Sequence, residues 1–381
     1  MDFESLRTCR VDQVGSLLRP QNLIDSFLAR GKNEISENAL SERQDAAIGA
    51  VIAEQERRGL PILSDGEFRR LSWQTSFWEV EGWELWSGSW AATLANPSLR
   101  GEHESANTKA DNAVVSYGVA ATGKLRLVES LPLQEWSYAA ACTDRPVKAM
   151  IMGPDRVAQM CHIEDSAPHY LDRQEFLDDV VSIHHQIVSG LVDAGCPYVQ
   201  LDEPSYTGYV DPESLEHMRI RGQDPLANLN AAIAASNGAI AGQKGRAVFG
   251  VHICRGNRAS MWHREGHYDG IAEAVFGQLE FDRLLLEYDT ERAGGFEPLR
   301  FVPKGRMVVL GLVTTKTATI ESADEIVARV EEASRFIDID QLAVSPQCGF
   351  ASGISGNDLT SDEQWAKLEL LHEVSDRIWG A

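Results

Sequence analysis

The chain has 381 residues, 43% of them hydrophobic and 24% charged, and a formal net charge of −22. This composition is typical of a soluble globular protein with a large core, and it argues against a nucleic-acid partner, because phosphate binding needs basic patches. No apolar run approaches the ~20 residues that cross a bilayer, and the N-terminus "MDFESLRTCR" lacks the apolar core of a signal peptide. We therefore expect a cytoplasmic protein with no membrane partner.

Short β-rich apolar runs alternate with helical patterns along the chain. The runs that predict strands are 9–16, 60–67, 146–154, 197–204, 247–254, 283–289, 306–313 and 341–349. Amphipathic patterns predict helices over 175–195 and 322–337, the second with Ser322 as its N-cap. Eight strands that alternate with helices most simply close into a (β/α)8 TIM barrel, an α/β fold. The alternative is an open doubly wound sheet, but no GxGxxG motif follows the first strand.

One interval breaks this alternation. We predict a single barrel domain over 1–381 with an insertion at about 79–145, on the carboxyl-terminal face because the insertion follows the second strand. The strand-like runs 113–119 and 124–130 predict a small hairpin inside it. The tryptophan-rich stretch 72–90 suits a stacking platform, internal packing or a contact between copies of the chain. The sequence does not fix the number of subunits, and it allows a homo-oligomer.

Polar residues gather where the predicted strands end. They are Asp65 and Glu67, Asp202 and Glu203, His252 and Cys254, Glu287, and Cys348. In a barrel the carboxyl ends of all strands meet on one face, which is where active sites lie. His252 and Cys254 are two residues apart on one strand, so their side chains point the same way.

The set His252, Cys254, Glu287 and Cys348 offers an imidazole, two thiolates and a carboxylate, which suit a four-coordinate zinc ion. Each residue alone has a simpler interpretation, since a cysteine at a strand end often packs in the core and a carboxylate there often caps a helix. Their convergence on one rim favours the metal site. Arg255, directly after the second ligand, suits an anionic substrate; the alternative is an ion pair with Glu287, Asp289 or Glu291.

Several stretches carry a family resemblance. They are "VGSLLRP" (14–20), "SDGEFRR" (64–70), "PVKAMIMGP" (146–154), "YVQLDEP" (198–204), "VHICRGN" (251–257), "LLLEYDTERAGGFEPLR" (284–300), "LGLVTTKT" (310–317) and "AVSPQCGF" (343–350). In this order they resemble the catalytic barrel of cobalamin-independent methionine synthase, in its short single-barrel branch. The resemblance covers the chain except for the interval 79–145.

The resemblance implies zinc held by His252, Cys254, Glu287 and Cys348. It also implies a small thiol substrate, most simply homocysteine, that receives a methyl group from a methyl-folate or another carrier. By the same resemblance, Gly15 and Ser16 bind the substrate carboxylate, while Glu67 and Asp202 face its ammonium group.

The chain departs from the full-length synthases in three ways. It has no counterpart of their N-terminal barrel, and Met160 stands where they have a tryptophan that stacks on the pterin. Lys316 stands where they have a histidine that donates a proton to the leaving group, so we predict Lys316, together with Asp202, as catalytic residues. Lys316 also suits an anionic donor or an ion pair with a carboxylate.

These departures leave two alternatives open. One is a zinc-dependent alkyltransferase with another thiol or electrophile, such as coenzyme M with an epoxide, or with a methylcobalamin donor. The other is a zinc-binding barrel without catalytic activity.

Overall fold

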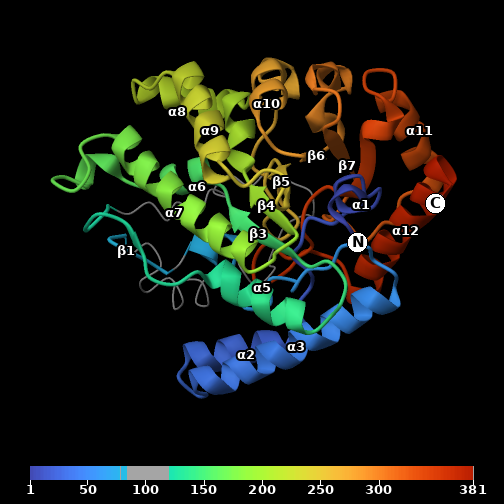
Figure 1. Cartoon of the computed structure of the whole chain (residues 1–381), viewed down its shortest axis with the longest axis horizontal. Coiled ribbons are helices and arrows are strands. Elements are labelled where there is room, and N and C mark those ends of the chain that lie inside the picture. The colour runs from blue at the N-terminus through green and yellow to red at the C-terminus, as the bar shows by residue number, and fades with distance from the viewer. Residues whose placement is uncertain (78, 84–119, 381) are drawn as a thin grey trace.

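The computed structural model describes residues 1–77, 79–83 and 120–380, and its centre is a parallel sheet of six strands (Figure 1). The strands pair in chain order, each with the next. They are β3 (Lys148–Met152), β4 (Tyr198–Asp202), β5 (Val248–Ile253), β6 (Arg283–Glu287), β7 (Met307–Val313) and β8 (Leu342–Pro346). All six match predicted runs, and each is buried along its whole length, as expected for strands covered by helices.

The first two predicted strands lie at the two ends of this sheet as extended segments, without a regular ladder of their own. They are joined by two parallel bridges, Val11 to Val344 of β8 and Leu63 to Val147 before β3, and the Leu17 N–H donates to the Gly66 carbonyl between them. Together the six strands and the two segments make the eight positions of the predicted α/β barrel. The two segments pair briefly because side chains such as Gln13, Gln55 and Ser64 take over part of their backbone hydrogen bonding.

Helices surround the strands in Figure 1. They are α1 (Phe3–Arg7), α2 (Gln21–Gly31), α3 (Glu37–Arg57), α5 (Leu131–Ala141), α6 (Pro154–Ala158), α7 (Arg173–Asp193), α8 (Pro212–Ile220), α9 (Pro225–Ala239), α10 (Ala272–Gln278), α11 (Ala323–Ala333) and α12 (Ser361–Trp379). Short 3-10 turns are η1 (Trp73–Phe77), η3 (Ile163–Asp165), η4 (Pro204–Tyr209), η5 (Tyr268–Gly270), η6 (Glu291–Ala293), η7 (Glu297–Phe301) and η8 (Ile339–Gln341). None of the helices in residues 1–77, 79–83 and 120–380 combines the length and the apolar content that a membrane span requires.

Both predicted helices are present. In α7, Phe176, Val180, Ile183 and Ile187 recur at helical spacing and are buried against the core, and Asp172 caps the first turn by accepting from the Glu175 N–H. Helix α11 follows Ser322 at the N-cap position, although the Ser322 hydroxyl makes no capping hydrogen bond. It ends at Ala333, four residues before the predicted end, because residues 334–336 form turns.

The interval 79–145 is described only at its two ends. Strand β1 (Val80–Glu81) pairs antiparallel with β2 (Arg126–Leu127), and α5 follows. The second arm of the predicted hairpin, 124–130, thus contains a strand, while the first arm, 113–119, lies outside the described residues. Trp83, from the tryptophan-rich stretch, packs edge-on against Phe176 of α7, with ring centroids 5.3 Å apart. For Trp83, internal packing is therefore the role that the structure supports.

The amino-terminal end of the barrel interior holds a buried polar cluster. Lys148 begins β3, and its ammonium lies 3.0 Å from the Asp12 carboxylate. Arg283, which begins β6, lies 3.2 Å from the other Asp12 oxygen, and the Tyr198 hydroxyl donates to it at 3.0 Å. Lys148 also donates to Gln200 in the middle of β4. Gln200 in turn donates to Asp202 at the end of β4, so hydrogen bonds connect this cluster to the carboxyl-terminal face.

Candidate metal centre and substrate cavity

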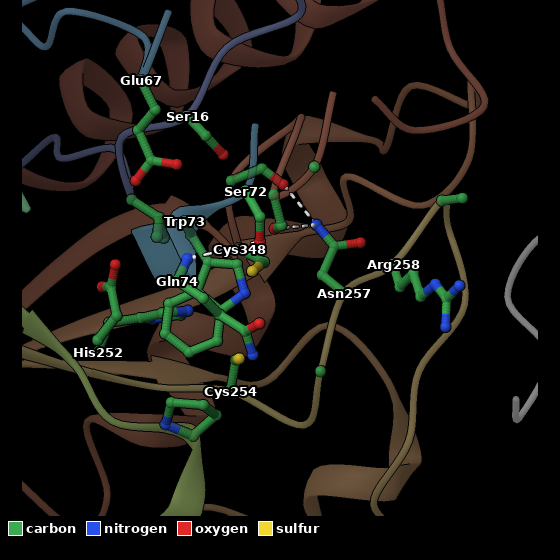
Figure 2. A pocket seen from close by; sticks show the side chains of 18 of the residues that line it. Ser16, Glu67, Ser72, Trp73, Gln74, His252, Cys254, Asn257, Arg258 and Cys348 are labelled. Carbon is green, nitrogen blue, oxygen red and sulfur yellow. Dashed lines mark hydrogen bonds between the residues drawn. The ribbon is translucent and has the colours of Figure 1, made fainter. Parts of the chain in front are cut away.

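A cavity of about 120 Å³ opens at the carboxyl ends of the strands. It is formed by loops that follow the strands, as in other barrels. The predicted site residues that line it are Ser16, Glu67, Asp202, His252, Cys254 and Cys348. Figure 2 shows His252, Cys254 and Cys348 close together, with Glu67 and Ser16 on one side of them and Arg258 on another.

The side chains of His252, Cys254 and Cys348 form a buried group whose potential ligand atoms all lie within 4.8 Å of one another. His252 and Cys254 reach it from one strand, since Gly250, His252 and Cys254 share the inward face of β5 and its end. Gly250 has to be a glycine there, because a Cβ would lie 2.6 Å from the Tyr198 hydroxyl. Cys348 arrives from the segment after β8, the neighbour of the first extended segment.

The donor atoms of this group suit a metal ion. Nδ1 of His252 lies 3.3 Å from the Leu285 carbonyl, which leaves the buried Nε2 with no hydrogen-bond partner among the described residues other than the Cys348 sulfur of the same group. A carbonyl on one ring nitrogen is the usual way in which a protein orients a histidine ligand. The hydrogen bond from the Cys254 thiol holds the pKa of Cys348 well below its usual range, although burial opposes this. One sulfur is thus already prepared to carry the negative charge that a metal ligand needs.

Glu287, the predicted fourth ligand, lies nearby but does not belong to the close group. It ends β6, and its Oε2 accepts the backbone N–H of Arg255 at 2.7 Å. Its Oε1 lies 3.8 Å from Nη2 of Arg292. Burial raises the pKa of Glu287, and the neighbouring Asp289 adds to this effect. Coordination by Glu287 stays a prediction.

Glu67 and Asp202 form an acidic side of the cavity. One Glu67 oxygen lies 3.1 Å from Arg70 Nη1, whereas the other is buried without a hydrogen-bond partner among the described residues. Burial raises the pKa of Glu67 to about 8, and Asp202 contributes to the rise. Burial likewise raises the pKa of Asp202, whose Oδ1 accepts a hydrogen bond of 2.7 Å from Gln200. A cationic ligand would relieve both effects, because it favours the ionised carboxylates.

Ser16 lines the cavity beside Gly349. Its Oγ accepts the Ala351 N–H at 3.3 Å, and a Cβ at Gly349 would lie only 1.9 Å from that oxygen. Gly15 does not line the cavity but has φ +143° and packs against Met150, so a side chain there would be strained. Both glycines therefore keep the Ser16 loop close to the cavity.

The structure does not place Arg255 in the cavity. Its guanidinium is buried, donates to the carbonyls of Gly266 and Glu287, and lies 4.3 Å from the centre of the Tyr268 ring. The side chain points away because its hydrogen-bond acceptors lie in the neighbouring loop. Arg255 does not form the alternative ion pair with the Glu287 carboxylate either, because its guanidinium binds the Glu287 backbone carbonyl.

Lys316 is also held outside the cavity lining. Its ammonium donates to the carbonyl of Gly256 at 2.9 Å, to the Asn257 side chain at 3.2 Å and to the Met261 carbonyl at 3.4 Å. Gly256 and Asn257 do line the cavity. Lys316 is thus placed to hold the loop after Cys254 in position. Met160 is buried in the core and is likewise absent from the lining.

Sequence reasoning missed several lining residues. They are Ser72, Trp73, Gln74, Arg156, Asn257, Arg258, His263 and Arg264. A signal existed for Trp73, which belongs to the tryptophan-rich stretch, and for Arg156, which comes just after a strand in "GPDR". Arg264 gave none, because it lies on an irregular loop whose path no periodic pattern predicts.

A barrel with a buried imidazole and two thiols at its carboxyl-terminal mouth defines a class of candidate metalloenzymes. Comparison with known proteins narrows the class, since the family model "Cobalamin-independent synthase, Catalytic domain" matches residues 88–372. The chain belongs to this family, and it is a methyltransferase.

Individual relatives agree over nearly the whole chain. The chain is 34% identical over 373 residues to the uncharacterized protein YxjG of Bacillus subtilis, covering 97% of this chain and 94% of that protein. It is 26% identical over 342 residues to the methionine synthase of Pyrococcus abyssi, covering 88% and 84% of the two chains. Among solved structures, a putative vitamin-B12 independent methionine synthase from Listeria monocytogenes matches with a TM-score of 0.74 and 26% identity, over 97% of this chain and 98% of that one.

Proposed function

We propose that the protein transfers a methyl group to the sulfur of a zinc-bound thiol, most simply homocysteine, to give methionine. The observation that carries the proposal is the convergence of His252, Cys254 and Cys348 within 4.8 Å at the mouth of the barrel. We also propose that the chain is one barrel domain with an insertion at about 79–145.

The residues present fit zinc. Two sulfurs and an imidazole nitrogen with no other hydrogen-bond partner are ligands that zinc prefers, and Glu287 is our proposed fourth ligand. Bound there, zinc would keep the sulfur of a substrate thiol ionised near neutral pH.

The protein's own groups then hold the amino-acid end of the substrate. Glu67 and Asp202 lie where they can pair with its ammonium group, while Ser16 and the backbone around it offer hydrogen bonds to its carboxylate. The sulfur lone pair forms the new bond to the methyl carbon, and the donor keeps the electrons of the bond that breaks. The geometry gives least support to Lys316 as proton donor, because its ammonium is already bound to three acceptors.

The acidic side of the cavity favours an amino-acid thiol over coenzyme M, which carries a sulfonate and no ammonium group. The pair Glu67 and Asp202 offers hydrogen-bond acceptors to an ammonium group and gives a sulfonate no partner. The same pair argues against mere metal storage, which needs no ammonium site.

The first test measures bound zinc in the wild type and in Cys254→Ser and Cys348→Ser, with Cys196→Ser as the matched control. Cys196 is as buried as the ligands but lies at the far end of the barrel, where it donates to the Tyr198 carbonyl. We expect about one zinc per chain in the wild type and the control, and a large loss in the two other variants. Full zinc content in both would refute the metal site.

The second test replaces zinc with cobalt and follows the absorption bands as thiols are added. Homocysteine should change the bands and coenzyme M should not, and methionine should form with either methyltetrahydrofolate or methylcobalamin as donor. Bands that respond to no thiol would refute the transfer proposal and leave a barrel that only binds metal.

A further inference from the structure

The lining of the cavity is partly cationic, although the chain as a whole is strongly acidic. Arg156, Arg258 and Arg264 all line the cavity. Arg156 belongs to α6 and is only 8% exposed. No described residue accepts a hydrogen bond from its guanidinium or forms an ion pair with it. A guanidinium that lines a cavity and has no ion-pair partner can bind an anion that enters the cavity.

Only part of the Arg264 guanidinium is hydrogen-bonded to described residues. Its Nη1 donates to the Pro204 carbonyl at 2.7 Å, and its guanidinium packs on Gly208, where a Cβ would lie 3.1 Å from the guanidinium carbon. The rest of its guanidinium makes no hydrogen bond to a described residue. Burial lowers the pKa of Arg156 to about 10, and the charge of the nearby Arg264 adds to this effect.

The acidic groups near these arginines, Glu203, Asp155 and Asp211, make other contacts. The Glu203 carboxylate accepts the backbone N–H groups of Asp155 and Arg156 at 3.0 and 3.1 Å, as well as the Ser205 hydroxyl. Burial raises the pKa of Glu203 to about 8, so this group carries little negative charge at neutral pH. Asp155 pairs with Arg173 and accepts from the Tyr209 hydroxyl. Asp211 caps α8 and accepts the backbone N–H of Glu265 at 3.1 Å. None of these carboxylates therefore forms an ion pair with Arg156 or Arg264.

Arg264 lies on the Cys254 side of the metal group, and Arg156 lies near Arg264. The Thr207 hydroxyl lies 2.8 Å from the Pro204 carbonyl and 2.9 Å from the Cys254 carbonyl, and the same Pro204 carbonyl accepts from Arg264. Figure 2 shows Cys254 on the far side of Cys348 from Glu67 and Ser16. The cavity thus has an acidic end and a basic end, with the sulfur ligands between them.

We propose that Arg156 and Arg264 form an anion subsite that binds a carboxylate or phosphate group of the methyl donor. The inference rests on the proposed function, in which the ammonium and carboxylate of the acceptor occupy the Glu67 and Ser16 end. An amino-acid thiol has both groups on one carbon, so it has no second anionic group for the opposite end. Two guanidinium groups suit a carboxylate or phosphate because each offers a planar pair of N–H donors.

The neighbouring His263 also lines the cavity without adding charge. Burial and the positive charges of Arg264, Lys316 and Arg156 lower the pKa of His263 to about 3, so its ring is neutral at working pH. A neutral imidazole has an N–H donor on one ring nitrogen and an acceptor on the other. His263 thus adds a neutral hydrogen-bonding group, and the positive charge of the subsite comes from the two arginines.

The test is isothermal titration of the zinc-loaded protein, saturated with homocysteine, with glutarate and separately with inorganic phosphate. The variants are Arg156→Gln, Arg264→Gln and Arg156→Lys, and Arg219→Gln on exposed α8 is the matched control. We expect one of the two anions to bind the wild type and the control, and about tenfold or weaker binding in both Gln variants. Arg156→Lys should retain part of the affinity, since it keeps the charge and loses the planar fork. Zinc content shows whether each variant is folded.

Binding of neither anion to the wild type, or equal binding in wild type and both Gln variants, would overturn the subsite. Competition between the anion and homocysteine, with weaker homocysteine binding in Arg156→Gln, would assign the arginines to the acceptor's carboxylate and overturn the donor assignment. If the anion binds as expected but no thiol changes the cobalt bands, the proposed function fails while the anion subsite stands.

Discussion

Lys148→Met tests whether the polar cluster at the base of the barrel stabilises the fold. The Lys148 ammonium is fully buried, lies 3.0 Å from the Asp12 carboxylate, and donates at 2.7 Å to Gln200. Methionine fills nearly the same volume, so the expected cost comes from the charge left on Asp12 and not from a cavity. Removing one partner of a buried ion pair costs about 3–5 kcal/mol. Arg283 and Tyr198 still contact Asp12, which places the expected loss near the lower end, at about 3 kcal/mol.

The assay is urea unfolding at pH 7, with Lys244→Met as the matched control. Lys244 pairs with Glu280 at the surface, where both side chains are 53% exposed, and such pairs contribute below about 1 kcal/mol. The variant should also unfold earlier in acid. Despite burial, Lys148 and Arg283 hold the pKa of Asp12 below its ordinary value, so its contribution to stability is lost as the pH falls through that lowered value. Without Lys148 the pKa of Asp12 rises, and the loss begins at higher pH.

One result would refute this reasoning. If Lys148→Met unfolded at the same urea concentration as Lys244→Met, with the same slope and an unchanged acid limit, the cluster would contribute nothing that methionine cannot replace.

Three further predictions concern the site. Gly349→Ala should weaken homocysteine binding at least about tenfold, because the new Cβ displaces Ser16, and zinc content should not change. The control Gly277→Ala, where a Cβ meets nothing within 4 Å, should bind homocysteine normally, and equal cobalt titrations of the two variants would contradict the prediction. The melting temperature of Glu67→Gln should rise relative to that of the wild type between pH 4.5 and about 8, because the wild type, with a folded pKa of about 8, loses stability across that range. A difference in melting temperature that does not change with pH would contradict this. Arg255→Lys should lower the free energy of unfolding by about 1–3 kcal/mol, because hydrogen bonds to Gly266 and Glu287 are lost, and should change the dissociation constant of homocysteine by no more than about twofold. A large loss of homocysteine binding would show that Arg255 belongs to the substrate site.

The sequence alone predicts most of the barrel because its signals are local. A strand alternates its faces every residue, so the run that contains Gly250, His252 and Cys254 turns all three inward wherever it packs. Strands alternating with helices leave few ways to bury both faces of a parallel sheet, and the barrel is one of them. The sequence also predicts which residues end the strands, and hence that Asp202, His252 and Cys254 share one face.

The tertiary structure decides what local signals cannot. Arg255 follows Cys254 directly, yet its side chain leaves the site because its acceptors, the carbonyls of Gly266 and Glu287, come from other parts of the chain. The ammonium of Lys316 likewise binds the loop after Cys254, because its acceptors there come from a distant part of the chain. That Arg156 and Arg264 form no ion pair with a described residue becomes clear only when their neighbours in space are known, since hydrogen bonding and ion pairing depend on distances that sequence separation does not contain. Alternation fixes the direction of a side chain on a strand, but beyond the strand's end its direction depends on which partners the fold brings within reach.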